Sequence, residues 1–150
     1  MLTYRRAVQT DAGLLVDIMD SSFYDDYVRY GECPGYGKTE DQMKLSILKF
    51  SKYIIEKDRI PVGVISFENK GDGQYYLGCL CVIPAYQGTG IGTQAVRYML
   101  SVCRDWKRVT LITPSGNARN IKFYTEKCGF SIGGKMMDGN VEVTEFILER

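Results

Sequence analysis

Apolar residues recur along the chain with two different periods, and the change from one period to the other predicts alternating strands and helices. Runs with strand character occupy Tyr53–Glu56, Pro61–Phe67 and Gln74–Val82. The segment from Asn69 to Gly73 combines glycine, asparagine and aspartate, which are typical of a hairpin turn. Further strands are predicted at 2–8, 109–113, 131–135 and 141–148. The sheet therefore opens with an antiparallel meander.

Four segments have the helical period instead. The first follows Thr10-Asp11, and the second follows the capping-box pattern Thr39-x-x-Gln42. The third begins near Ile91, and the fourth begins at Asn117, a favourable N-cap residue. The apolar positions that define the first three are Leu14, Leu15, Ile18 and Met19, then Met43, Leu45 and Leu48, then Ala95, Val96, Met99, Leu100 and Cys103.

The stretch between the first two helices, 21–38, is polar, rich in tyrosine and broken by glycine and proline. It predicts a loop with room to bind a ligand. Aromatic and acidic side chains alternate in and beside it, namely Phe23, Tyr24, Tyr27, Tyr30 and Tyr36 with Asp20, Asp25, Asp26 and Glu32. Such a mixture suits a small cationic amine, through carboxylate pairing and cation–π contact. A solvated loop is the alternative interpretation.

Composition excludes several kinds of site. The chain has no histidine, which removes histidine-based triads and metal sites, and we expect no metal ion. The formal net charge is +1 without a long basic block, so nucleic acid is a poor partner. No run approaches the length of a membrane span, and five cysteines without a C-x-x-C pair suggest reduced thiols. We expect a soluble cytoplasmic protein with no membrane partner.

A glycine-rich turn lies between the strand that ends at Val82 and the third helix: Gln87-Gly-Thr-Gly90-Ile-Gly92. Glycine lets consecutive backbone N–H groups converge on anionic oxygens at a helix N-terminus, so the turn predicts a pyrophosphate site. A P-loop is excluded because no Gly-Lys-Ser/Thr follows, and the spacing of the glycines does not fit G-x-G-x-x-G.

The spacing fits Q/R-x-x-G-x-G/A and resembles the acetyl-CoA loop of the GCN5-related N-acetyltransferases (GNAT family). A second segment from Asn117 to Phe130 is similar to that family's N-x-x-A-x-x-x-Y-x-x-x-G-F pattern, with Asn120 where the family usually has alanine and one residue more between Tyr124 and Gly129. The resemblance implies one α/β domain, 1–150, with a mixed and mostly antiparallel sheet of about seven strands and about four helices. It also implies an N-acetyltransferase that uses acetyl-CoA.

The resemblance assigns roles to particular positions. The main chain of Leu80, Cys81 and Val82 would hydrogen-bond the pantetheine arm, which Asn117 would also touch. The backbone of the glycine loop would hold the pyrophosphate; its residues are Gln87, Gly88, Thr89, Gly90, Ile91, Gly92 and Thr93. Tyr124 would donate a proton to the departing thiolate. For Asn117 a capping role, and for Tyr124 a core role, are the alternatives. No general base is assigned.

The acceptor is expected to be a small amine that binds Tyr24, Asp25, Asp26 and Tyr27. Two other functions stay open at this point: a protein acetyltransferase acting on a lysine or an N-terminus, and a non-catalytic CoA-binding module on the same fold. The sequence does not decide the oligomeric state, and a homodimer stays open.

Overall fold

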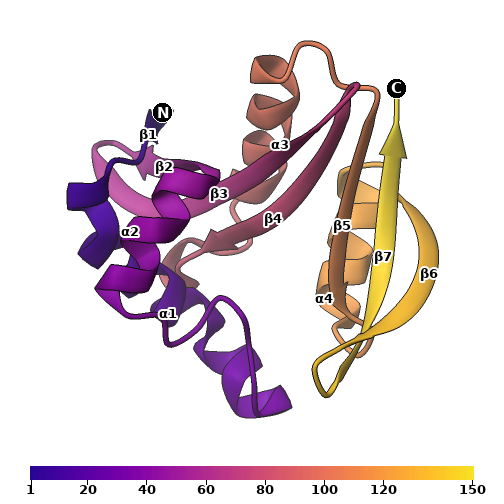
Figure 1. The fold of residues 1–150 in the computed structure, drawn as a ribbon, viewed down its shortest axis with the longest axis horizontal. Coiled ribbons are helices and arrows are strands. Elements are labelled where there is room, and N and C mark those ends of the chain that lie inside the picture. Colours follow the sequence, from indigo (N-terminus) through magenta and orange to yellow (C-terminus); the bar gives the residue numbers. More distant parts are fainter. The chain divides into compact units, whose positions relative to one another are not determined.

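The computed structural model describes all 150 residues as seven strands and four α-helices (Figure 1). The strands are β1 (Leu2–Arg6), β2 (Ser51–Lys57), β3 (Ile60–Gly71), β4 (Gln74–Val82), β5 (Arg108–Pro114), β6 (Ser131–Asp138) and β7 (Val141–Glu149). The helices are α1 (Ala12–Tyr30), α2 (Glu40–Lys49), α3 (Ile91–Val102) and α4 (Ala118–Lys122).

The strands follow the order β1-β2-β3-β4-β5-β7-β6 in one mixed sheet. The pairs β1–β2, β2–β3, β5–β7 and β6–β7 are antiparallel, whereas β4 and β5 are parallel. This confirms the predicted fold class, including the number of strands and helices. The predicted strand Gln74–Val82 matches β4 at both ends.

The molecule divides into two compact units, and β3, β4 and α3 each contribute residues to both. The first unit contains residues 1–67 and 79–95. Within it, α1 and α2 lie against β2 and β3 (Figure 1). Their shared core joins helix residues such as Leu15, Met19 and Met43 to strand residues such as Ile54 and Val64. Burial of these apolar faces is the main stabilising contribution.

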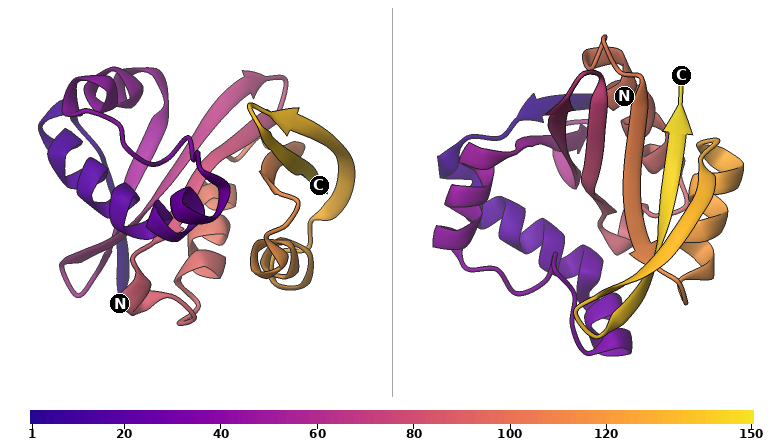
Figure 2. Two further views of the ribbon diagram at one scale, coloured as in Figure 1. Left: turned by 90° about the horizontal axis from the view of Figure 1, so that it is seen from below. Right: turned by 45° about the vertical axis from the view of Figure 1, so that its right-hand side comes forward.

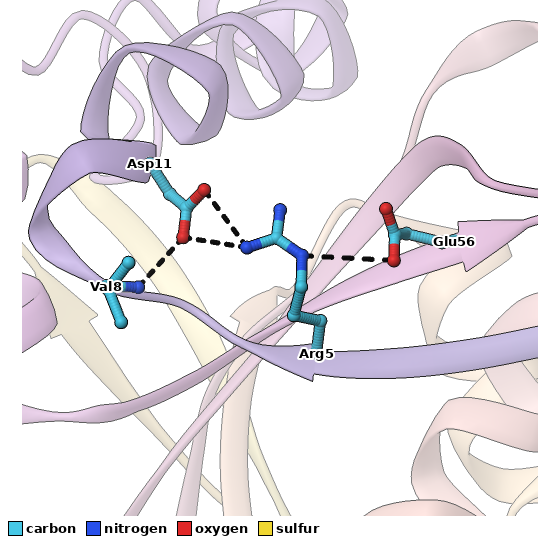
Figure 3. Close-up of polar contacts among 4 residues, drawn as sticks. All are labelled: Arg5, Val8, Asp11 and Glu56. Carbon is cyan, nitrogen blue, oxygen red and sulfur yellow. Dashed lines mark hydrogen bonds and ion pairs between the residues drawn. The ribbon is translucent and has the colours of Figure 1, made fainter.

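A charged network fixes the start of α1 beside β1 (Figure 3). One guanidinium nitrogen of Arg5 lies 3.0 and 3.1 Å from the two carboxylate oxygens of Asp11, and Glu56 lies 3.9 Å from another. The Val8 N–H also donates to Asp11, at 2.9 Å. Partial burial raises the pKa of Asp11, but these two donors outweigh it and lower the pKa below its ordinary value.

The prediction of a loop from residue 21 was wrong for its first half. Helix α1 continues to Tyr30 and ends at Gly31, which has a φ of 77° and donates its N–H to the Tyr27 carbonyl. Glycine reaches this left-handed conformation without a Cβ clash, so Gly31 is the helix stop. After Met19 the half-buried positions of α1 are mixed, because Ser22 and Asp26 lie there beside Phe23, and the apolar period on which the prediction depended is lost.

Helix α2 begins as predicted, because Thr39 and Gln42 form the capping box through reciprocal hydrogen bonds of 2.9 and 3.1 Å. The predicted apolar face was partly wrong. Met43 and Ile47, four residues apart, are buried, while Leu45 and Leu48 are 68% and 69% exposed. An i, i+4 pair shares one helix face, whereas Met43 and Leu45 do not.

The second unit contains residues 68–78 and 96–150. Its sheet joins the start of β4 to β5 and then to the β6–β7 hairpin (Figure 2). Val109, Leu111 and Phe146 are among its buried side chains. The Tyr75 hydroxyl donates a 2.5 Å hydrogen bond to Asp105, which links β4 to the turn before β5.

Candidate functional site

The glycine loop of the first unit has a conformation that requires glycine. After β4 the chain makes a short 3-10 turn, Pro84–Tyr86, and then passes through Gly88 and Gly90 with φ of 76° and 85°. Nothing lies within 4 Å of where a Cβ would stand on either residue. The backbone here is therefore strained for any other residue but open to an approaching ligand.

Two polar side chains hold the shape of this loop. The side-chain amide of Gln87 donates to the Val82 carbonyl at 2.9 Å, and the Thr89 hydroxyl donates to the Tyr86 carbonyl at 2.6 Å. Each bond joins a side chain of the loop to a carbonyl of the same segment. Gln87 and Thr89 therefore stabilise the loop conformation, a role that the motif alone did not indicate.

The loop leads directly into α3. The N–H of Gln94 is bonded to the Gly90 carbonyl at 3.2 Å, so the N–H groups of Ile91, Gly92 and Thr93 fall in the first helical turn, which has no intrahelical acceptors. That turn contains no acidic residue. The free N–H groups and the helix dipole at such a terminus favour an anion. The Ile91 side chain is 3% exposed and packs inward, so only its main chain can serve a ligand.

The strand segment before the loop is close-packed. The Cys81 side chain is buried, and a Cβ added to Gly63 would stand 2.4 Å from the Cys81 carbonyl oxygen. The parallel pairing of β4 with β5 comprises only Gln74–Arg108, Tyr75–Val109 and Tyr76–Thr110, while β4 itself continues to Val82. The predicted main-chain positions Leu80, Cys81 and Val82 thus lie beyond the part of β4 that pairs with β5.

Asn117 and Tyr124 belong to the second unit. The Asn117 side chain accepts a 3.0 Å hydrogen bond from the Asn120 N–H, which confirms its capping role at the start of α4. The Asn120 side chain donates to Thr113 at the end of β5, at 3.0 Å. This bond explains the asparagine at a position where the motif usually has alanine, because it fastens α4 to the sheet.

Tyr124 lies in a π-helical turn, Phe123–Lys127, that follows α4 and contains a 3.2 Å hydrogen bond from the Cys128 N–H to the Phe123 carbonyl. Wider turns of this kind are rare and frequently accompany functional sites. The Tyr124 ring is 8% exposed and contacts Phe123, Phe130 and Phe146, with ring centroids 4.9 to 5.8 Å apart. Tyr124 therefore packs in the core, which is the role that the sequence analysis gave as the alternative to proton donation.

The predicted acceptor residues lie on the last two turns of α1, in the first unit. Tyr36, from the segment after α1, stacks on Tyr27 with centroids 4.4 Å apart and lies 6.1 Å from Tyr24. The Gly37 N–H donates to Asp20 at 2.8 Å and fastens that segment to α1. The three tyrosines are therefore an ordered aromatic surface; Tyr24 and Tyr27 are 53% and 41% exposed.

The two adjacent carboxylates have different surroundings, since neighbouring helix residues do not face the same side. Asp25 is exposed and Asp26 is half-buried. Burial raises the pKa of Asp26, Arg29 opposes that shift, and the charge of Asp25 adds to it. The structure thus separates a pair that the sequence treated as one unit.

A polar group that the sequence analysis missed lies under the same helices. Lys52 on β2 is only 4% exposed, and its ammonium donates a 3.2 Å hydrogen bond to the Ser66 hydroxyl on β3. The alternation of side chains along a strand could have predicted its burial, because Lys52 is two residues from Ile54 and so lies on the same inward face of β2. Burial lowers the pKa of Lys52, and Cys79 and Lys38 are among the charges that act on it.

No group of three or more histidine, cysteine, aspartate or glutamate side chains is placed to hold a metal ion. All five cysteines are free thiols. None of the helices has the length and apolar character that crossing a membrane requires.

Comparisons with known proteins identify the family and agree with the fold. A sequence model of the acetyltransferase (GNAT) family matches residues 18–130. A comparison with curated protein sequences gives no significant match. An acetyltransferase from Thermus thermophilus superposes with a TM-score of 0.80 at 17% identity, over 100% of this chain and 97% of that one.

Two similar structures were solved with coenzyme A. The PaiA N-acetyltransferase from Thermoplasma acidophilum has a TM-score of 0.78 at 16% identity, over 97% of this chain and 98% of its own. The aminoglycoside acetyltransferase AAC(6')-Ib has a TM-score of 0.77 at 20% identity, over 100% and 95%. At these identities the likeness shows the fold.

Proposed function

Because this chain belongs to the acetyltransferase (GNAT) family and its cofactor is acetyl-CoA, we propose that it acetylates a primary amine of a small cationic molecule. The amine would attack the thioester carbonyl directly. The observation that carries the proposal is the end of α1, where the carboxylates of Asp25 and Asp26 lie on the same helical turns as the exposed rings of Tyr24 and Tyr27.

The glycine loop fits a pyrophosphate. Open space above Gly88 and Gly90, together with the acid-free first turn of α3, supports backbone binding by residues Gln87 to Thr93. We assign the pantetheine arm to the main chain of Leu80 and Cys81 in particular, because the Val82 carbonyl already accepts the Gln87 amide. Asn117 would assist with the part of its amide that capping does not use.

Acetyl-CoA supplies the acyl group, and the residues of this chain would handle the protons. Tyr124 would donate a proton to the departing thiolate, because a phenol with a pKa of about 10 stays protonated at neutral pH. Its buried, aromatic surroundings keep water away, which favours a directed transfer.

The acceptor class rests on chemistry at α1. A cation beside carboxylates and aromatic faces gains from both, by about 0.5 to 2 kcal/mol for the cation–π part. The name of one similar structure gives an aminoglycoside as its substrate, which supports a small-molecule acceptor.

A screen of acceptors with detection of released CoA thiol tests the proposal. The panel should hold aliphatic diamines, aromatic amines, an aminoglycoside, amino-acid amides, and peptides with a free lysine or N-terminus. We expect turnover on small cationic amines. Turnover on peptides alone would move the function to protein acetylation, and the absence of turnover on every compound would contradict the proposal.

We propose that residues 1–150 act as one acetyltransferase domain, since the family match and the similar folds together span the chain. The five free thiols suit a reducing compartment, and the cytoplasm is the location we propose.

A further inference from the structure

A polar row crosses three strands of the first unit beside its apolar core. On β2 and β3, Ile54 lies opposite Val64, and Lys52 lies opposite Ser66. The Ile83 N–H donates to the Val62 carbonyl at 2.8 Å, which fixes the antiparallel register of β3 and β4 there. Two-residue steps along this register place Cys81 opposite Val64 and Cys79 opposite Ser66. The apolar row Ile54–Val64–Cys81 is therefore followed by Lys52–Ser66–Cys79.

Lys52 is a buried cation whose direct contacts are a hydroxyl and an aromatic ring. Its ammonium donates to the Ser66 hydroxyl and lies 5.8 Å from the centre of the Phe50 ring. The Ser66 hydroxyl accepts this bond and can still donate its own proton to a neighbouring acceptor. A buried ammonium is costly unless a negative charge lies close, and the next residue in the row is a cysteine.

The surroundings of Cys79 favour its negative form. The neighbouring Cys81 and the positive charges of Lys52 and Lys38 together outweigh the effect of burial and lower the pKa of Cys79. The neighbouring Cys79 and burial raise the pKa of Cys81 well above its ordinary value. Thiolates are stabilised in just such settings beside cations.

The row also lies beside the acceptor residues. Cys33, from the segment after α1, interacts electrostatically with both Asp26 and Cys79. Phe23 of α1 and Cys79 both pack against the core cluster that contains Cys81. Cys79 is half-buried, and it directly precedes Leu80, where the proposed pantetheine segment begins. A base that takes a proton from the amine substrate would have to lie between the acceptor residues and the proposed pantetheine segment.

We propose that Cys79 is a thiolate held by Lys52 through Ser66, and that it is the proton acceptor for the amine substrate. The inference rests on the proposed function and supplies the base that the sequence did not reveal. Cys81, Lys38 and Cys33 complete the set of titratable groups around it, with Asp26 beyond Cys33.

The proton transfers balance as follows. An ammonium acceptor gives one proton to the Cys79 sulfur, which becomes a neutral thiol. The neutral amine attacks the acetyl carbonyl, so that a C–N bond forms and the C–S bond to CoA breaks. The departing thiolate takes its proton from Tyr124, and the second proton that the nitrogen loses as the amide forms restores the Tyr124 hydroxyl through solvent. Cys79 then returns its proton to solvent. No oxidant or reductant is required.

The thiolate can be tested without any acceptor. The ultraviolet absorbance of thiolate at neutral pH should be larger in the wild type than in Cys79→Ser by one thiolate, and Lys52→Met should abolish that difference. Lys70→Met removes an exposed lysine and should preserve it. Equal absorbance in the wild type and Cys79→Ser would overturn the inference.

Reactivity gives a second measure. Iodoacetamide, whose iodide leaves as the S–C bond forms, should label Cys79 with a midpoint pH below that of Cys128, a half-buried thiol whose pKa burial raises to about 11. Lys52→Met should raise the Cys79 midpoint by at least one pH unit, about a tenfold loss of rate at neutral pH. An unchanged midpoint would contradict the role of Lys52.

Kinetics test the proton transfer itself, with 1,4-diaminobutane as the first acceptor and then the best amine of the screen. Cys79→Ser should lower kcat by about 10² to 10⁴ and leave the acetyl-CoA KM within about twofold. Lys52→Met should move the acidic limb of the kcat/KM profile to higher pH, and Cys128→Ser should keep the parent profile. Parent-level turnover in Cys79→Ser would overturn the role of Cys79 but not the proposed function. The absence of turnover with any amine would contradict the proposed function.

Discussion

At the scale of single residues, Tyr124 combines a packing role with a proposed chemical one. Its ring contacts three aromatic side chains, and Tyr124→Phe keeps that ring while removing the hydroxyl. We expect the variant to keep its fold and acetyl-CoA affinity but to lose about 10² to 10⁴ in kcat, the usual contribution of a general acid. Steady-state kinetics with calorimetry of acetyl-CoA binding measure both quantities.

Phe123→Leu is the matched control, because Phe123 adjoins Tyr124 and contacts its ring without carrying a hydroxyl. It should cost stability and change kcat little. A Tyr124→Phe enzyme that acetylates its amine at the parent rate would return Tyr124 to a purely structural role.

Single residues also show what a sequence can reveal. The capping role of Asn117 was predictable because a cap is a local hydrogen bond over three residues. The bond from Asn120 to Thr113 and the burial of Lys52 were not, since each depends on a neighbour brought close by the sheet. The role of a side chain whose partner lies on another strand can be predicted only when the pairing register of the strands is known.

At the scale of elements, the glycine loop is a segment whose backbone conformation can be tested separately from its packing. A Gly90→Val substitution would force a β-branched residue to a φ of 85°, although its Cβ would meet open space. We expect the fold to persist and acetyl-CoA binding to fall by at least about tenfold, which corresponds to about 1.4 kcal/mol. Calorimetry measures the change.

Gly134→Ala on β6 is the control, because that glycine also has open space around its Cβ position but lacks a positive φ. It should bind acetyl-CoA as the parent does. Unchanged affinity in a folded Gly90→Val protein would remove the loop from the binding site.

Helix α1 shows where element-level prediction failed. The sequence pattern of strand β4, the glycine loop and helix α3 is local, and the structure has these three elements in the predicted order. The last turns of α1 carry Ser22 and Asp26 toward the interior, and these residues give no apolar period. Gly31, the first glycine after Gly13, marked the helix stop more reliably than the hydrophobic pattern did.

The end of α1 makes a prediction about substrate choice. Replacing Asp25 and Asp26 together by asparagine should raise the KM of a cationic acceptor several-fold and leave acetyl-CoA affinity nearly unchanged, because the donor binds another element. Higher salt should reduce the difference between parent and variant, since Asp25 is exposed. An unchanged acceptor KM would show that α1 does not select the amine.

At the scale of the whole molecule, Asp11 and Asp26 of the first unit should make the stability of the fold depend on pH in opposite directions. The pKa of Asp11 is lowered: burial opposes the shift, but the Val8 N–H and Arg5 outweigh it. Its charged form therefore stabilises the fold above its ordinary pKa, and this contribution disappears as pH falls through the lowered value. The pKa of Asp26 is raised by burial, so its charged form destabilises the fold at neutral pH, and that penalty disappears as pH falls through the raised value.

Thermal unfolding of Asp11→Asn and Asp26→Asn tests both signs in one experiment. At neutral pH, Asp11→Asn should lower Tm by roughly 2 to 4 °C if the lost ion pair and hydrogen bond are worth about 1 kcal/mol. Asp26→Asn should raise Tm, because a neutral amide replaces a half-buried charge whose desolvation outweighs the attraction of Arg29. Both differences should shrink toward zero in acid below the lowered pKa of Asp11, where the parent carboxyls are protonated. A loss of stability in Asp26→Asn at neutral pH would mean that the carboxylate has a favourable partner in the folded chain, and would weaken the case that this residue is kept for a cationic substrate.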